Sequence, residues 1–123
     1  MHRAVRFSHL SPPRQALIRL CQSTNYGFIK DLAVQRSEPV LTDFRPLVLI
    51  DIKLESEYEV RPELNLPDFV LSAELVRLMS LFDRIEDGKI HKSEIRAGIP
   101  RRVAVERSLS ECQASSHEAE RGS

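Results

Sequence analysis

Two stretches of this sequence match each other without a gap, 61 residues apart. The first runs from Leu10 to Pro39 and the second from Leu71 to Pro100. Each copy of a repeat is expected to form one structural unit, so the fold has to place two similar units. The identical pairs are Leu10/Leu71, Ser11/Ser72, Leu17/Leu78, Leu20/Leu81, Gly27/Gly88, Ile29/Ile90 and Pro39/Pro100.

The first copy has the pattern of a helix followed by a β-hairpin. Ser11 is a favourable N-cap, and Pro12 suits the first helical position because an N–H there has no partner inside the helix. Residues 28–35 favour a strand, residues 36–39 a turn, and a return strand begins at Val40. The apolar stripe of the helix consists of Ala16, Leu17, Leu20 and Cys21.

The second copy predicts the same elements. Its helix begins at Asp68 or at Ser72, and residues 89–96, 97–100 and 101–106 favour a strand, a turn and a return strand. In each copy an early isoleucine of the first strand has the opposite parity to a later apolar residue. A β-bulge at the same place in both copies would explain this, as would a strand with both faces partly buried. The residues concerned are Ile29 and Val34 in the first copy, and Ile90 and Ile95 in the second.

The chain between the copies adds one more strand. Residues 47–54 alternate in a strand-like pattern, residues 55–67 have the composition of an acidic surface loop, and the polar residues 108–123 are expected to be disordered. The sequence therefore predicts an α+β fold in the order α-β-β-β-α-β-β, with a mostly antiparallel sheet. One domain covers residues 1–107 and contains unit one (10–42), the linking strand and acidic loop (43–67) and unit two (68–106).

A helix followed by a Tyr-Gly-x-Ile strand, a tight turn and a return strand resembles the YezD-like family of short bacterial proteins. The resemblance covers roughly residues 14–41. It departs from the family at the turn, where Arg36, Ser37 and Glu38 replace the usual Asp-Gly or Asn-Gly. The resemblance implies a fold and no activity. The matching residues are Tyr26, Gly27, Ile29, Val34, Pro39 and Val40.

Residues 83–94 resemble an EF-hand calcium loop, which places oxygen ligands at positions 1, 3, 5 and 12 and a glycine at position 6. Gly88 occupies position 6, but Ile85 stands at position 3 and offers no side-chain oxygen. The repeat also explains Gly88 by fold alone, because Gly27 is its counterpart. Weak calcium binding by a degenerate loop is therefore an alternative, with Asp83, Asp87 and Glu94 as the ligands.

The charge is neutral in total but uneven along the chain. Residues 1–36 and 89–107 are basic, and residues 37–88 are acidic. A basic surface for an anionic partner would explain this pattern, as would compensation of charges within one fold. Nucleic-acid binding through the second hairpin and the N-terminal arginines is thus a further alternative. The surface would comprise Lys89, Lys92, Arg96, Arg101 and Arg102 on the hairpin, together with Arg3, Arg6, Arg14 and Arg19.

Other patterns do not point to catalysis. The four histidines are scattered, and two cysteines form no disulfide framework. The sequence contains no glycine-rich phosphate loop and no apolar run of membrane-spanning length. We expect a cytoplasmic, non-enzymatic protein without a cofactor or membrane contact. A protein-interaction or regulatory role is the main interpretation, through a protein partner or self-association at exposed hairpin edges.

Overall fold

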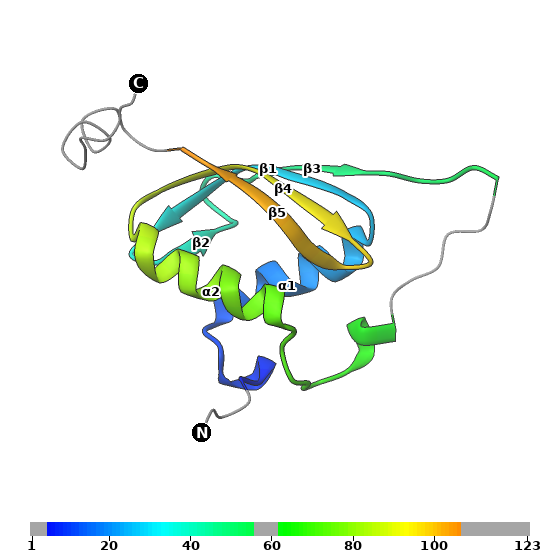
Figure 1. Ribbon diagram of the computed structural model, residues 1–123, viewed down its shortest axis with the longest axis horizontal. Helices are drawn as coiled ribbons and strands as arrows, with labels where there is room; N and C mark the ends of the chain where they lie inside the picture. Colours follow the sequence, from blue (N-terminus) through cyan, green and yellow to red (C-terminus); the bar gives the residue numbers. More distant parts are fainter. Residues whose placement is uncertain (1–4, 56–61, 107–123) are drawn as a thin grey trace.

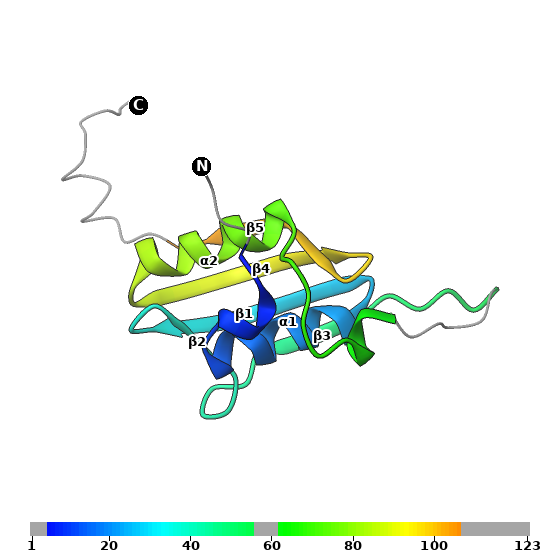
Figure 2. The same cartoon turned by 90° about the horizontal axis from the view of Figure 1, so that it is seen from below.

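Two helices lie against one face of a five-stranded antiparallel sheet in the computed structural model (Figure 1). Figure 2 shows both helices from the side that they cover. The structure describes residues 5–55 and 62–106. The predicted α+β fold and its element order, α-β-β-β-α-β-β, are confirmed. The helices are α1 (Pro12–Thr24) and α2 (Ala73–Ile85), and the strands are β1 (Gly27–Gln35), β2 (Glu38–Val40), β3 (Leu47–Ile50), β4 (Gly88–Arg96) and β5 (Ile99–Val105).

The two helices begin at the predicted serine caps. Ser11 precedes α1, whose first residue is Pro12, and Ser72 precedes α2. Of the two starts considered for the second helix, the structure selects Ser72, because its hydroxyl oxygen accepts a hydrogen bond from the N–H of Leu75. Asp68 lies before the helix and instead accepts hydrogen bonds from Arg6 and from the N–H of Ser8.

Both hairpin turns are tighter than the four residues expected from the sequence. Arg36 and Ser37 have φ of 53° and 65°, and Ala97 and Gly98 have φ of 54° and 76°. Positive φ at both central residues is what a two-residue type I′ turn requires, and this turn matches the twist of the strands that it joins. Consequently β2 and β5 begin two residues earlier than predicted, at Glu38 and Ile99.

β1 and β4 form the centre of the sheet, and their register relates the two units symmetrically. Gly27 is paired with Ile95, and Val34 with Gly88. A shift of 61 residues converts each pair into the other. The two α-β-β units therefore face each other across β1 and β4 as if related by a two-fold axis. β2 and β3 both pair with the outer side of β1, and β5 pairs with the outer side of β4.

The parity change in each central strand coincides with a local irregularity, which is closer to the first of the two causes considered, a β-bulge, than to the second. Asp31 has φ of 60° and no partner in the pairing between β1 and β4, and the pairing of β4 with β5 shifts between Ile90 and Lys92. On both strands the buried positions change parity at this point. The residues that reach the core are Ile29, Leu32 and Val34 on β1, and Ile90, Ser93 and Ile95 on β4.

β3 is shorter than the strand predicted over residues 47–54. It ends at Ile50 because Ile50 is paired with Gly27, the first residue of β1. One further backbone bond follows, from the N–H of Asp51 to the carbonyl of Tyr26 (2.7 Å). Beyond it the chain leaves the sheet. Part of the predicted acidic loop lies outside the described residues, and Pro62–Asn65 form a 3-10 turn, η2. The predicted disordered tail also lies outside them.

The core lies between the sheet and the helices, and apolar side chains from both units fill it. Phe82 of α2 and Leu17 and Ile18 of α1 are almost fully buried there. Ile18 replaces Ala16 of the predicted stripe, since Ala16 is exposed. At roughly 25 cal/mol per Å² of apolar surface, burial of such side chains is the main stabilising contribution. The remaining core residues include Phe7, Cys21, Leu32, Val34, Leu71, Leu75, Leu78 and Met79.

Two equivalent hydrogen bonds tie each hairpin to the other unit. The N–H of Ser37 donates to the carbonyl of Glu86, and the N–H of Gly98 donates to the carbonyl of Asn25, both at 2.8 Å. The acceptors are the residues that end α2 and α1, where helical carbonyls lack partners inside the helix. Each hairpin turn thus donates a hydrogen bond to the carbonyl group at the end of the other unit's helix.

Gly27 generates a stability prediction because the backbone of β3 passes close to it. A Cβ at this position would stand 1.9 Å from the carbonyl oxygen of Leu49. We expect Gly27→Ala to lower the free energy of unfolding by about 2 kcal/mol or more, measured by urea denaturation. Gly88→Ala is the matched control, because its Cβ would meet only the side chain of Ile85 at 2.9 Å, which is able to move. Equal losses in the two variants would contradict this account.

Candidate interaction surfaces

The structure does not form the EF-hand predicted at residues 83–94. Asp83 belongs to α2, Asp87 to the turn that follows, and Glu94 to β4. Asp83 forms an ion pair with Arg14 at 2.6 Å, and a carboxylate oxygen of Asp87 accepts a hydrogen bond from a backbone N–H. The helix–loop–helix interpretation is wrong because the chain continues from Gly88 as a strand, which carries Glu94 away along the sheet.

Within residues 5–55 and 62–106, no three His, Cys, Asp or Glu side chains are grouped so as to hold a metal ion. His91 has two carboxylate neighbours. It lies on β4 between Glu106, at 2.5 Å, and Asp31, at 3.9 Å.

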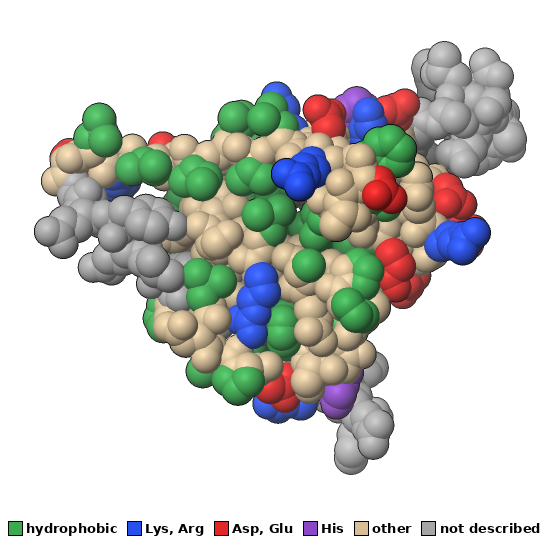
Figure 3. All heavy atoms as spheres, turned by 180° about the vertical axis from the view of Figure 1, so that it is seen from behind, with side chains coloured by type: hydrophobic (Ala, Val, Ile, Leu, Met, Phe, Trp, Pro, Cys, Tyr) green, Lys and Arg blue, Asp and Glu red, His purple; other side chains and the backbone are tan. Residues whose placement is uncertain are grey.

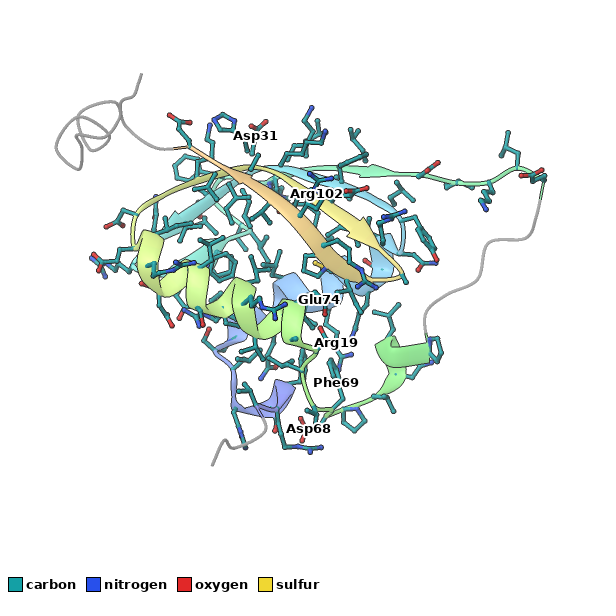
Figure 4. The ribbon with its side chains drawn as sticks, in the orientation of Figure 1. Arg19, Asp31, Asp68, Phe69, Glu74 and Arg102 are labelled. Atoms are coloured by element: carbon teal, nitrogen blue, oxygen red, sulfur yellow. The ribbon has the colours of Figure 1, made fainter. Side chains whose placement is uncertain are left out.

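The N-terminal arginines do not extend the basic surface of the second hairpin. Arg14 of α1 forms ion pairs with Asp83 and Glu38 and donates a hydrogen bond to the carbonyl of Ser37. It thereby connects α1 to α2 and to the hairpin of β1 and β2. Arg6 forms an ion pair with Asp68 at 2.7 Å, which lowers the pKa of that carboxyl. Figure 4 shows Arg19 on the helix side of the sheet, away from Asp31 and Arg102. Arg3 lies outside the described residues.

Arg19 is part of a packed cluster on the helix side. Its guanidinium lies 4.2 Å from the ring centre of Phe7, which stacks on Phe69 at 4.9 Å. Arg19 also donates a hydrogen bond to the carbonyl of Leu66. These contacts make it a structural residue, so the prediction of one continuous basic surface from both ends of the chain is wrong.

The basic residues of the second hairpin are divided between two surfaces. The open face of the sheet, which no described helix covers, carries Lys92, whose ammonium lies 4.6 Å from the ring centre of Phe28. Lys92 is also the direct cross-strand partner of Lys30, a residue absent from the predicted set. Like charges in that position repel each other. By strand alternation from the buried Ile90 and Ile95, Lys89 and Arg96 project to the same face.

Arg101 and Arg102 line a groove between α2 and β5. Its volume is about 320 Å³. Figure 1 shows β5 running above α2. The floor of this groove is apolar, with Leu78, Leu81, Pro100, Val103 and Val105, and its rim carries Glu74, Arg77, Arg84 and Arg101. Arg102 also borders the groove, but it is the cross-strand partner of Glu94 and its side chain lies on the open face of the sheet. Arg77 and Arg84 were missed by the sequence analysis because they lie on the polar side of a helix, where isolated arginines give no signal.

The rim of the groove has an excess of positive charge. Arg101 forms an ion pair with Glu74 at 2.7 Å, and the pKa of this carboxyl is lowered, chiefly by its own backbone N–H and also by the charge of Arg101. Arg77 and Arg84 make no ion pair with any described residue, although the charge of Arg77 also lowers the pKa of Glu74. An apolar floor beside the cations Arg77 and Arg84 suits a ligand that is both apolar and anionic.

A third surface is apolar and lies at the opposite edge of the sheet. Figure 3 shows hydrophobic side chains gathered along β3 and the segment that follows it. Leu54 is 95% exposed, and about half of each neighbouring apolar side chain is exposed as well. Exposed apolar patches of this kind mark contact sites. The residues are Phe44, Leu47, Leu49, Ile50, Ile52 and Leu54.

No known protein family, curated protein or solved structure matches the chain. None of the helices in the described part of the chain has the length and apolar character needed to cross a membrane. The described structure is an antiparallel sheet with both helices on one face. It has a cationic groove beside β5 at one edge and exposed apolar side chains on β3 at the other.

Cys21 generates a prediction about reactivity. It is buried in the core, and burial raises the pKa of its thiol to about 12. Since the thiolate is the reactive form, we expect Cys21 to resist a thiol reagent at pH 8 in the folded chain. A Cys112→Ser variant isolates Cys21, and labelling is followed with and without denaturant. Labelling at the same rate in both conditions would contradict this expectation.

Proposed function

We propose that this protein is a non-catalytic protein-interaction module that binds an acidic, partly apolar segment of a partner in the groove between α2 and β5. The observation that carries the proposal is the rim of the groove, where Arg77 and Arg84 form no ion pair with a described residue. Cations at a groove rim attract an anionic partner, while the apolar floor supplies contact area.

The geometry of β5 favours an extended peptide as the ligand. β5 is the last strand of the sheet order, and within the described residues its outer side pairs with no other strand. An exposed strand edge recognises extended chains by adding them as another strand. A peptide added beside β5 places alternate side chains over the groove floor, and its acidic residues then meet the arginines.

A fluorescence titration tests this proposal with a labelled synthetic peptide of alternating glutamate and leucine. We expect saturable binding that weakens as salt is added, because the charge attraction is screened. The double variant Arg77→Glu/Arg84→Glu is expected to weaken binding at least about tenfold, since two attractive contacts become repulsive. Unchanged thermal melting would show that this variant remains folded.

Arg45→Glu is the matched control, because Arg45 is exposed in the connection between β2 and β3 and lies outside the groove lining. A second control is the same peptide with lysine in place of glutamate, which should not bind. Binding that the double variant leaves unchanged, or an equal affinity for the lysine peptide, would overturn the proposal.

A second candidate function is single-stranded nucleic-acid binding on the open face of the sheet. The observation that favours it is the direct pairing of Lys30 with Lys92, next to the ring of Phe28. Neighbouring cations contact phosphates, and an aromatic ring on an open sheet stacks with bases.

A single-stranded oligonucleotide titrated at two salt concentrations tests this candidate. We expect weaker binding at the higher salt, and Lys30→Glu/Lys92→Glu should reduce binding at least about tenfold at low salt. Arg77→Glu/Arg84→Glu serves as the control, because these residues lie on α2 on the other side of the sheet. No association at low salt would remove this function.

We also propose that the two units arose by duplication of one α-β-β unit of the YezD-like type. Equivalent elements support this idea, since each helix spans 13 residues and each central strand spans 9. We further propose a cytoplasmic location for the protein. The presence of only two cysteines in the sequence is compatible with this location.

A further inference from the structure

The outer side of β3 has backbone groups available for pairing. Within the described residues β3 pairs only with β1. The N–H of Asp51 points toward β1, because it donates to the carbonyl of Tyr26. Backbone groups alternate in direction along an extended chain, so those of Ile50 and Ile52 point away from the sheet. Figure 1 shows the chain continuing beyond β3 in the same direction.

The side chains of this segment are sorted by face. Leu49 is the cross-strand partner of Phe28 and Val48 that of the buried Ile29, so Leu49 lies on the open face and Val48 on the helix side. Continuing the alternation as far as the turn at residues 54–55 places Asp51 and Lys53 with Leu49, and Ile50 and Ile52 with Val48. The charged side chains of this segment therefore lie on the open face, and its isoleucines lie on the helix side.

The order of charges is self-complementary when two copies of the segment run antiparallel. With Ile52 opposite Ile52 of a second copy, Asp51 stands opposite Lys53 of that copy, and Lys53 stands opposite its Asp51. In this register the outward N–H and carbonyl groups of Ile52 meet their counterparts directly, so the hydrogen-bond pattern fits as well.

We propose that the protein forms a two-fold symmetric dimer by antiparallel pairing of residues 51–53 of two copies, centred on Ile52. The pairing joins the segments that continue from β3 in the two copies and brings their Ile52 side chains together, each of which is 53% exposed in the single chain. Asp51 and Lys53 set the register through two equivalent cross-strand ion pairs. This dimer uses the edge of the sheet opposite to the groove and goes beyond the proposed function.

Sedimentation equilibrium over a range of protein concentrations tests the dimer. The short interface predicts a weak dimer, with association rising over roughly the micromolar to millimolar range. Asp51→Lys alone and Lys53→Asp alone should each weaken dimerisation at least about tenfold, because two attractive contacts become repulsive. The double variant Asp51→Lys/Lys53→Asp should restore it, because every pair is again of opposite charge.

A mixture of the two single variants gives the sharpest result. An equimolar mixture of Asp51→Lys and Lys53→Asp should form a mixed dimer although each variant alone is monomeric. Asp43→Lys is the matched control, since it makes the same charge change in the exposed segment before β3 and should leave dimerisation unchanged.

Amide hydrogen exchange identifies the edge itself. On dimerisation the amide of Ile52 should become protected, whereas that of Asp51, already bonded to Tyr26, should change little. A wild-type chain that stays monomeric at millimolar concentration overturns the proposal. So does a dimer that the single variants leave unchanged, that the double variant fails to restore, or that leaves the exchange of Ile52 unaltered.

Discussion

The antiparallel pairing of β1 with β4 is the interaction on which the rest of the structure depends. Each of these strands contributes buried residues from its own unit, and the two strands are paired along most of their length. Neither unit has a helix on both faces of its hairpin, so a single α-β-β unit leaves much of its apolar surface exposed. Joining the strands produces one core from two partial ones. The hydrogen bonds from Ser37 to Glu86 and from Gly98 to Asn25 fix the same arrangement at both ends of the sheet.

Much of this fold follows from the sequence because local signals agreed with the repeat. The start of α1 after Ser11 and the strand that follows each helix have local causes, and the sequence predicts them. The two-residue turns were not predicted, because positive φ at Arg36 and Ser37 is uncommon for such residues. The repeated glycines Gly27 and Gly88 are not equivalent in the structure, since only Gly27 lies against another backbone. That contact depends on β3, which has no counterpart among the described elements of unit two.

The candidate surfaces were harder to predict than the fold. The hairpin cations were correctly recognised as exposed, but Arg101 and Lys92 occupy different surfaces because strand alternation separates them. Arg14 and Arg19 belong to the packing, as their partners come from distant parts of the chain. The groove combines α2 with β5, and its arginines become a group only when helix and strand are brought together. The two edges of the sheet are consequently unlike, with cations beside β5 and apolar side chains on β3.

The symmetric pairing of β1 and β4 also governs how the chain acquires its structure during synthesis. Val34 and Gly88 are separated by 54 positions, and Gly27 and Ile95 by 68. Unit one is therefore synthesised before β4, the strand that pairs with β1. The edge of β1 that faces β4 stays unpaired until most of unit two has been made. Contacts so distant in sequence slow folding, because a long loop must close before they form. Until β4 is synthesised, the nascent chain presents an unpaired apolar strand, and this interval is when it is most exposed to wrong partners.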